Sequence, residues 1–503
     1  MEEEHRTGSN LTREELIALA DTRPYVLVDI ILAQNERIQV LEAHVSELMT
    51  ICEKLSGRVV ELEAQAAKNS SNSSKPPSMD GFNKPKPKSL RKKSGKKRGG
   101  QFGHKGETLK MIESPNEVVV HPLDLCPCGC GSSLEDEPVL DYKKRQVFEM
   151  PKPTLTVIEH RVEVKRCPRS GKMVAASFPG DVNARAQYGP GFTAFLVYLR
   201  NVQLVPLKRI SQMCFDLFGY SVSEATIVLA TERAGESLQG FEQSVKQSLG
   251  KAVVLHADET GLRARGDLNW LHVLSNGHLT WYGVHAKRGR TALEHFDILP
   301  RFTGHLIHDC WSPYFSFDCS HGLCNAHILR ELKFCHEELK QRWAKRMERH
   351  LCDTHRLVEY EKQAGVSGLS ALRRKRIERD YDAILSQGRL EQPATSFVPP
   401  KRGRRKKSKA ANLLDRLDKY RDFVLAFTTD FRAPFTNNQA EQDVRMMKVQ
   451  QKISGGFRTF EGAQKFALVR SYISTARKHG LDILPAITDA LCGRPFIPAM
   501  TPE

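Results

Sequence analysis

The sequence predicts a multidomain α+β protein: an N-terminal coiled coil, a small Cys-rich domain, a helical region, and a mixed α/β core interrupted by a helical insertion. Three observations carry this prediction. Apolar heptads occupy residues 27–66, Cys knuckles follow a basic linker, and two apolar runs end in acids, Asp258 and Asp309. Short apolar runs bounded by turn residues are typical of buried strands.

Length, charge and Cys content limit the class of protein. A chain of 503 residues is expected to form three or four folding units. Its formal charge of +17 is clustered, which favours nucleic acid over membrane as the polyanionic partner. No run approaches 18 apolar residues, and the acidic start MEEEHRTGS is unlike a signal peptide, so no membrane segment is expected. Scattered Cys residues without a disulfide-like framework favour a reducing cytoplasm.

Residues 1–66 are expected to form a coiled-coil dimerisation region. Heptad positions a and d hold Ile31, Ile38, Val45, Cys52 and Val59 (a) and Leu41, Leu48, Leu55 and Leu62 (d). β-Branched a residues with Leu at d are typical of parallel two-stranded coiled coils, so a homodimer or higher homo-oligomer is expected. Gln34 at d and Gly57 at f weaken the pattern. The alternative is a lone amphipathic helix folded on its own domain.

Residues 67–106 form a basic linker that is too polar to bury a core. Its predicted DNA-binding residues are Arg91, Lys92, Lys93, Lys96, Lys97 and Arg98. An arm that tracks phosphates would bind DNA with a steep dependence on salt. The alternative is a solvated tether.

Residues 107–185 carry two Cys knuckles and are expected to form a zinc-ribbon-like domain. The expected Zn²⁺ ligands are Cys126, Cys128, Cys130 and Cys167. Strand-like segments at 139–149 and 154–165 lie between the knuckles, and four thiolates would close a tetrahedron. Neither knuckle has a regular C-x-x-C, and Ser170 stands where another Cys is expected, with His121 as a substitute ligand. The alternative is a degenerate knuckle that folds without metal.

Residues 186–245 predict a helix, a turn containing Gly219, and a second helix with Ser223 as its N-cap. This helix–turn–helix layout is that of a module whose second helix enters a DNA groove. The alternative is an αα-hairpin that only packs, because Ile227, Val228 and Leu229 give the second helix an apolar start.

The core is expected in two parts, 246–330 and 433–490, around a helical insertion at 331–432. A strand ending at Asp258, a hairpin turning at Asn276-Gly277, a helix at 291–296 and a strand ending at Asp309 follow one another. An acid that only caps a strand–turn junction is the alternative at either position. The insertion contains a second basic loop with the predicted DNA-binding residues Lys401, Arg402, Arg404 and Arg405.

A third acid, Glu441, is expected in the first turn of a helix after the insertion, with Asn438 as the N-cap. Arg445 lies one turn further, where it is expected to orient the carboxylate or meet a DNA phosphate. The alternative role of Glu441 is a capping box with Asn438, which the helix dipole also favours. Residues 491–503 are expected to form a C-terminal tail.

Seven motifs in order over residues 25–490 resemble the insertion-sequence-66 family of DDE transposases. They are NSSNSSKPPS, GGQFGHKG, the Cys knuckles, HADETG, HDCWSPY, CNAHILREL and NNQAEQDVR. The order of the core elements also resembles the ribonuclease-H-like fold of nucleic-acid-cutting enzymes. The family resemblance implies a bacterial DNA transposase with Asp258, Asp309 and Glu441 as catalytic triad. Cys324 and His327 match a family motif; a buried helix start is the expectation for them, and a metal role is the alternative.

Three carboxylates of this kind can hold two Mg²⁺ or Mn²⁺ ions about 3.5–4 Å apart. Asp258 is expected to bridge both ions, with Asp309 on one and Glu441 on the other. The expected partners are the terminal inverted repeats of the element, target DNA, and accessory proteins of the same element, with a location at the bacterial nucleoid. Two alternatives stay open: a metal-dependent nuclease or resolvase without strand transfer, and an inactive DNA-binding relative.

Overall fold

The computed structural model describes residues 11–69, 72–73, 103, 108–392 and 407–499. Its elements fall into two units, one formed by Met1–Lys86 with Thr303–Asn438 and the other by Pro87–Phe302 with Gln439–Glu503. Most of the basic linker and of the second basic loop lies outside the described residues. The predicted DNA contacts that fall there are Arg91, Lys92, Lys93, Lys96, Lys97, Arg98, Lys401, Arg402, Arg404 and Arg405.

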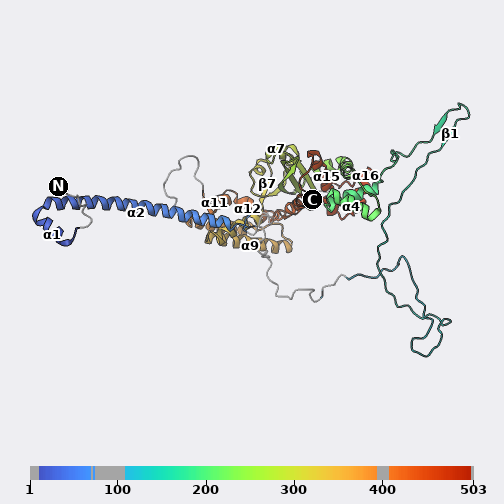
Figure 1. Ribbon diagram of the computed structural model, residues 1–503, viewed down its shortest axis with the longest axis horizontal. Helices are drawn as coiled ribbons and strands as arrows, with labels where there is room; N and C mark the ends of the chain where they lie inside the picture. Colours follow the sequence, from blue (N-terminus) through green and yellow to red (C-terminus); the bar gives the residue numbers. More distant parts are fainter. Residues whose placement is uncertain (1–10, 70–71, 74–102, 104–107, 393–406, 500–503) are drawn as a thin grey trace, which may run out of the picture. The chain divides into compact units, whose positions relative to one another are not determined.

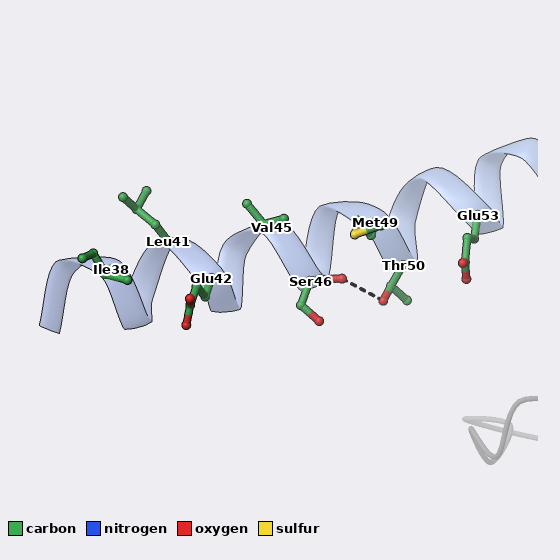
Figure 2. A pocket seen from close by; sticks show the side chains of 8 residues that line it. All are labelled: Ile38, Leu41, Glu42, Val45, Ser46, Met49, Thr50 and Glu53. Carbon is green, nitrogen blue, oxygen red and sulfur yellow. Dashed lines mark hydrogen bonds between the residues drawn. The ribbon is translucent and has the colours of Figure 1, made fainter. Parts of the chain in front are cut away.

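The N-terminal part consists of helices α1 (Arg13–Thr22) and α2 (Pro24–Ala66), and α2 is a single unbroken rod in Figure 1. Pro24 opens α2, where its missing N–H has no helical partner to lose. No described side chain of α2 is buried. A shallow groove runs along its surface, with Leu41 and Val45 on one side of the helix and Glu42 and Ser46 on the other (Figure 2). The predicted helix is confirmed, and its apolar stripe faces solvent.

Residues 108–185 contain little regular structure. Strand β1 (Val164–Arg166) pairs antiparallel with β2 (Met173–Ala175). The strand predicted at 139–149 is wrong, and only the end of the one predicted at 154–165 joins β1. Apolar side chains along these segments are exposed, such as Leu140 (95%) and Val147 (86%), so no packed face stabilises strand pairing there.

Five helical segments precede the sheet: α3 (Pro190–Val197), a π-helical turn (Tyr198–Val202), α4 (Leu207–Phe218), α5 (Glu224–Glu236) and α6 (Gln239–Gly250). The predicted helix–turn–helix elements are confirmed. Gly219 ends α4 at φ +76°, a conformation that favours Gly, and the Ser223 hydroxyl accepts from the Thr226 N–H at 3.1 Å. Helix α5 buries Ile227 and Ala230 and packs against α3.

Strands β3 (Val254–Ala264), β4 (Asp267–Ser275) and β5 (Thr280–His285) form an antiparallel meander in the order β5-β4-β3. The predicted hairpin at Asn276 is confirmed, and α7 (Arg290–His295) and a 3₁₀ turn (Leu299–Arg301) follow it. Three later helices belong to the same unit: α14 (Asn438–Ser454), α15 (Phe460–Lys478) and α16 (Ile483–Leu491). One core cluster joins the sheet to α14 and α15: Leu262, Ala264, Leu271, Val273, Tyr282, Val284, Ala440, Val444, Met447 and Phe466.

The other unit contains a parallel strand pair and a helical insertion. Strand β6 (His305–His308) pairs with β7 (Ser320–Leu323), and a 3₁₀ turn (Ser312–Ser316) lies between them in sequence. The helices are α8 (Asn325–Glu337), α9 (Arg342–Gln363), α10 (Ala371–Leu390), α11 (Lys409–Lys419), α12 (Arg421–Val424) and α13 (Ala426–Thr429). They share a core that includes Trp343, Leu351, Tyr381 and Leu414. The helices predicted within residues 331–432 are confirmed, and the described chain is a mixed α/β structure.

Candidate active site

Asp258 lies inside β3 rather than at its end, so the prediction that the strand stops at this acid is wrong. Strand β3 continues to Ala264 because Thr260, Leu262 and Ala264 are buried at alternate positions and pair with β4. The Asp258 Oδ1 accepts from the N–H of Glu259 at 2.8 Å. That bond fixes the carboxylate on a rigid strand.

The two neighbouring acids, Asp258 and Glu259, point to opposite faces of the sheet, as successive strand residues must. The Glu259 carboxylate is only 2% exposed and accepts from Arg288, whose guanidinium also lies over the ring of Trp270 at 4.8 Å. A buried carboxylate paired in this way is a structural ion pair. Glu259 is therefore held in an ion pair on one face of the sheet, and Asp258 lies on the other face.

Asp258 shares its sheet face with Val273 and Tyr282, which stand opposite one another along β3, β4 and β5. Val273 and Tyr282 pack against Val444 of α14 and its neighbours in the core cluster. The Gln451 amide of α14 also donates to the Gly261 carbonyl of β3 at 2.9 Å. Helix α14 therefore covers the face of the sheet that carries Asp258.

Glu441 lies in the first turn of α14, as predicted. The helix begins at Asn438 itself, so the expected N-cap is the first helical residue, a shift of one position. Lys448 lies two turns after Glu441 on the same side of the helix. Partial burial lowers the pKa of Lys448, and the nearby Asp258 carboxylate opposes that shift. Strand β3 and helix α14 thus bring an acid and a cation to one interface.

Lys448 was missed by sequence reasoning, which singled out Arg445 instead. Arg445 and Lys448 are both exposed on α14. The seven-residue spacing from Glu441 to Lys448 was the available signal, because residues seven apart share a helix face. Burial lowers the pKa of Lys448 and the Asp258 carboxylate opposes this shift, so Lys448 is one cation close to this acid.

Asp309 belongs to the other unit and directly follows β6, as predicted. Its Oδ1 accepts from the Trp311 N–H at 2.9 Å. The Nδ1 atom of His308 contacts the main-chain carbonyl of Asp309. Its Nε2 atom lies 3.1 Å from Nδ1 of His321. Burial lowers the pKa of His308 to about 3, so this ring is neutral at physiological pH. The chain around Asp309 is therefore held by a buried, uncharged hydrogen-bond network.

Cys324 and His327 stand at the start of α8, in the same unit as Asp309. Cys324 is 1% exposed and its sulfur accepts from the Asn437 N–H at 3.2 Å. Burial lowers the pKa of His327 to about 4. The expectation of a buried helix start is confirmed for Cys324.

Three thiols of the first Cys knuckle lie together: the sulfurs of Cys126, Cys128 and Cys130 are within 4.8 Å of one another. Cys167 is not part of this cluster in the described chain. A hydrogen bond with Ser132 lowers the pKa of Cys130 to about 6, whereas the contact with Cys126 raises that of Cys128. Thiols are soft ligands that suit Zn²⁺. A structural zinc site has four ligands, so this cluster of three would need one more.

Comparison with known families gives two matches. Residues 185–465, more than half of the chain, match the family described as Transposase IS66 family. Residues 32–110 match a family of unknown function, DUF6444. No curated protein matches the sequence. Among the described helices, none has the length and apolar character needed to cross a bilayer.

Proposed function

Because the chain belongs to the IS66 transposase family, we propose that it is the DNA transposase of a bacterial insertion sequence, which cleaves the ends of its element and joins them to target DNA. The observation that carries this proposal is the family match over residues 185–465, which contains Asp258, Asp309 and Glu441. The packing of α14 on the Asp258 face of the sheet supports it.

The ligand atoms of the three acids indicate whether this site could bind a divalent metal ion. Asp258, Asp309 and Glu441 offer carboxylate oxygens, the ligands that Mg²⁺ and Mn²⁺ prefer. The neighbouring acid Glu259 is already neutralised by Arg288, so it does not compete. When bound, such ions would lower the pKa of an attacking water or 3′-hydroxyl and neutralise charge on the phosphate.

The protein groups of the proposed site have separate roles. Asp258 is held on β3 by the N–H of Glu259, and Glu441 is carried by α14 above the same sheet face. Lys448 supplies a positive charge beside Asp258 that can pair with a DNA phosphate oxygen. Arg445, exposed on α14, is a further phosphate contact.

Three further parts of the proposal concern the rest of the chain. The α4–α5 unit is the proposed DNA-binding module. The α2 stripe is the proposed homodimer interface. The thiols of Cys126, Cys128 and Cys130, with Cys167 brought in as fourth ligand, form the proposed Zn²⁺ site. For zinc, the check is metal content: wild-type protein carries about one Zn²⁺ by the ligand count of such sites, and Cys128→Ser carries none.

Product analysis tests the proposed reaction. Purified protein is incubated with Mg²⁺, a DNA duplex ending in the terminal repeat of the element, and a supercoiled target. Joined donor–target molecules are the expected product. Hydrolysed donor ends without joined molecules would make the protein a nuclease or resolvase, and binding without any cleavage would make it an inactive relative.

A further inference from the structure

We propose that a buried polar network, the Asp443 clamp, sets the position of Glu441 over the sheet and makes Tyr282 a positioning residue for catalysis. The clamp consists of Asp443 on α14, Thr280 and Tyr282 on β5, and Lys478 on α15. The inference rests on the proposed function, because it assigns the clamp a role only if Glu441 binds the metal.

The clamp joins the first turns of α14 to the strand β5. The Tyr282 hydroxyl donates to the main-chain carbonyl of Asp443 at 2.9 Å. The Thr280 hydroxyl donates to the Asp443 carboxylate at 3.4 Å. Asp443 lies two residues after Glu441, so these contacts fix α14 close to the point where it presents the proposed ligand.

Lys478 completes the clamp from the end of α15. Its ammonium donates to the carbonyls of Asn276 and Leu279 at 2.8 and 3.0 Å and to the Asp443 carboxylate at 3.2 Å. All three of its donors are used. The side chains of Lys478 and Asp443 are only 14% and 11% exposed. A buried pair with satisfied hydrogen bonds specifies one geometry more than it adds stability.

The location of the clamp argues for a role in the site rather than in packing alone. The apolar cluster around Val444 and Met447 already fastens α14 to the sheet. Apolar contacts are not directional, and the one directional bond from this side of α14 described above, from Gln451 to Gly261, lies ten residues after Glu441. Directional bonds from β5 hold α14 nearer to Glu441, at Asp443. Since Tyr282 lies in one row with Asp258 across the sheet, the clamp ties Glu441 to the strand register that also places Asp258.

The test compares two Tyr→Phe variants that each lose a buried hydrogen bond to a carbonyl together with a second contact of the same hydroxyl, to the Ser474 hydroxyl for Tyr282 and from the Phe496 N–H for Tyr472. Tyr282→Phe removes the bond to Asp443, and the matched control Tyr472→Phe removes the 3.0 Å bond to Ala486 of α16. Both variants are made in the full-length protein. Cleavage of a terminal-repeat duplex is measured over a range of Mg²⁺ concentrations, and thermal unfolding and DNA binding are measured in parallel.

We expect Tyr282→Phe to slow cleavage at least tenfold and to raise the Mg²⁺ concentration for half-maximal rate at least fivefold, with DNA binding unchanged. Tyr472→Phe stays within twofold of wild type in both kinetic readouts. A loss of folded molecules alone lowers the rate at every Mg²⁺ concentration without moving the midpoint, so the midpoint separates positioning from stability.

Two outcomes decide the inference. If Tyr282→Phe behaves like Tyr472→Phe while Glu441→Gln is inactive, the clamp inference is wrong and the proposed function stands. If Glu441→Gln remains active, the proposed role of Glu441 fails first. Should Tyr282→Phe not fold, Thr280→Val replaces it, because this near-isosteric change removes only the hydroxyl bond to Asp443; an unchanged Mg²⁺ midpoint in that variant also overturns the inference.

Discussion

Helices α15 and α2 are both rich in apolar residues but differ in what covers them. Helix α15 buries side chains all around its circumference, from Phe466 to Ile473, against β5 and α5. Helix α2 is more than twice as long, yet none of its described side chains is buried. Leu48 and Leu55 are each 59% exposed. Apolar periodicity thus shows that a helix needs a covering surface, but not whether the same chain provides it.

The largest expected effect is a loss of stability when a buried side chain of α15 is truncated. Phe466 is 1% exposed within the core cluster. Phe466→Ala should lower the free energy of unfolding by about 3–5 kcal/mol through lost burial and a cavity. Urea denaturation measures this, and the loss should be the same at low and high protein concentration. A loss that disappears at high concentration would mean that α15, like α2, depends on a partner.

A smaller effect, confined to assembly, is expected in α2. Val59 and Val60 are adjacent and each 51% exposed, but only Val59 falls at heptad position a. Val59→Asp should weaken self-association about 100-fold, or roughly 2.7 kcal/mol, by placing two charges in a coiled-coil core. Val60→Asp is the matched control and should leave it unchanged. Sedimentation over a concentration series measures the self-association of both variants. Equal self-association of the two would contradict the proposed heptad interface.

The smallest expected effect comes from cross-linking at Cys52, which reports the relative orientation of the two α2 helices in the dimer. Cys52 is exposed and also falls at position a. In a parallel, in-register pair the two Cys52 side chains face one another, so mild oxidation or a short bis-maleimide should give a covalent dimer. Cys52→Ser should abolish this product while the non-covalent dimer persists. A dimer in which Cys52 never cross-links would require an antiparallel or staggered pairing.

Sequence reasoning succeeded where local patterns and burial agree. The hairpin at Asn276, the Ser223 N-cap and the position of Glu441 in a first helical turn were all readable, because each depends on residues a few positions apart. Sequence reasoning failed at 139–149, where a strand-like segment was predicted but the described side chains find no packed surface. It also ended the Asp258 strand too early, because buried residues at every second position after the acid, Thr260, Leu262 and Ala264, continue the pairing with β4.

The contacts around Glu441 were beyond sequence reasoning for a different reason. Tyr282 and Asp443 are 161 positions apart, and Asp443 and Lys478 are 35 apart. No periodicity links such residues, since their proximity depends on how α14 and α15 pack on β5. Lys448 is an intermediate case: its helix face was readable from Glu441, but its interaction with Asp258 was not.

The most direct measurement of the central claim is the Mg²⁺-dependent cleavage rate of Asp258→Asn, Asp309→Asn and Glu441→Gln, each made alone. Glu461→Gln is the matched control, because Glu461 occupies the first turn of α15 as Glu441 does that of α14. Loss of a helix-dipole contact costs only about 0.3–1 kcal/mol of stability. Each of the three variants should lose at least about 1,000-fold in rate, equivalent to roughly 4 kcal/mol, with unchanged unfolding temperature, and Glu461→Gln should keep wild-type activity. Near wild-type cleavage by any one of the three would contradict its role as a metal ligand.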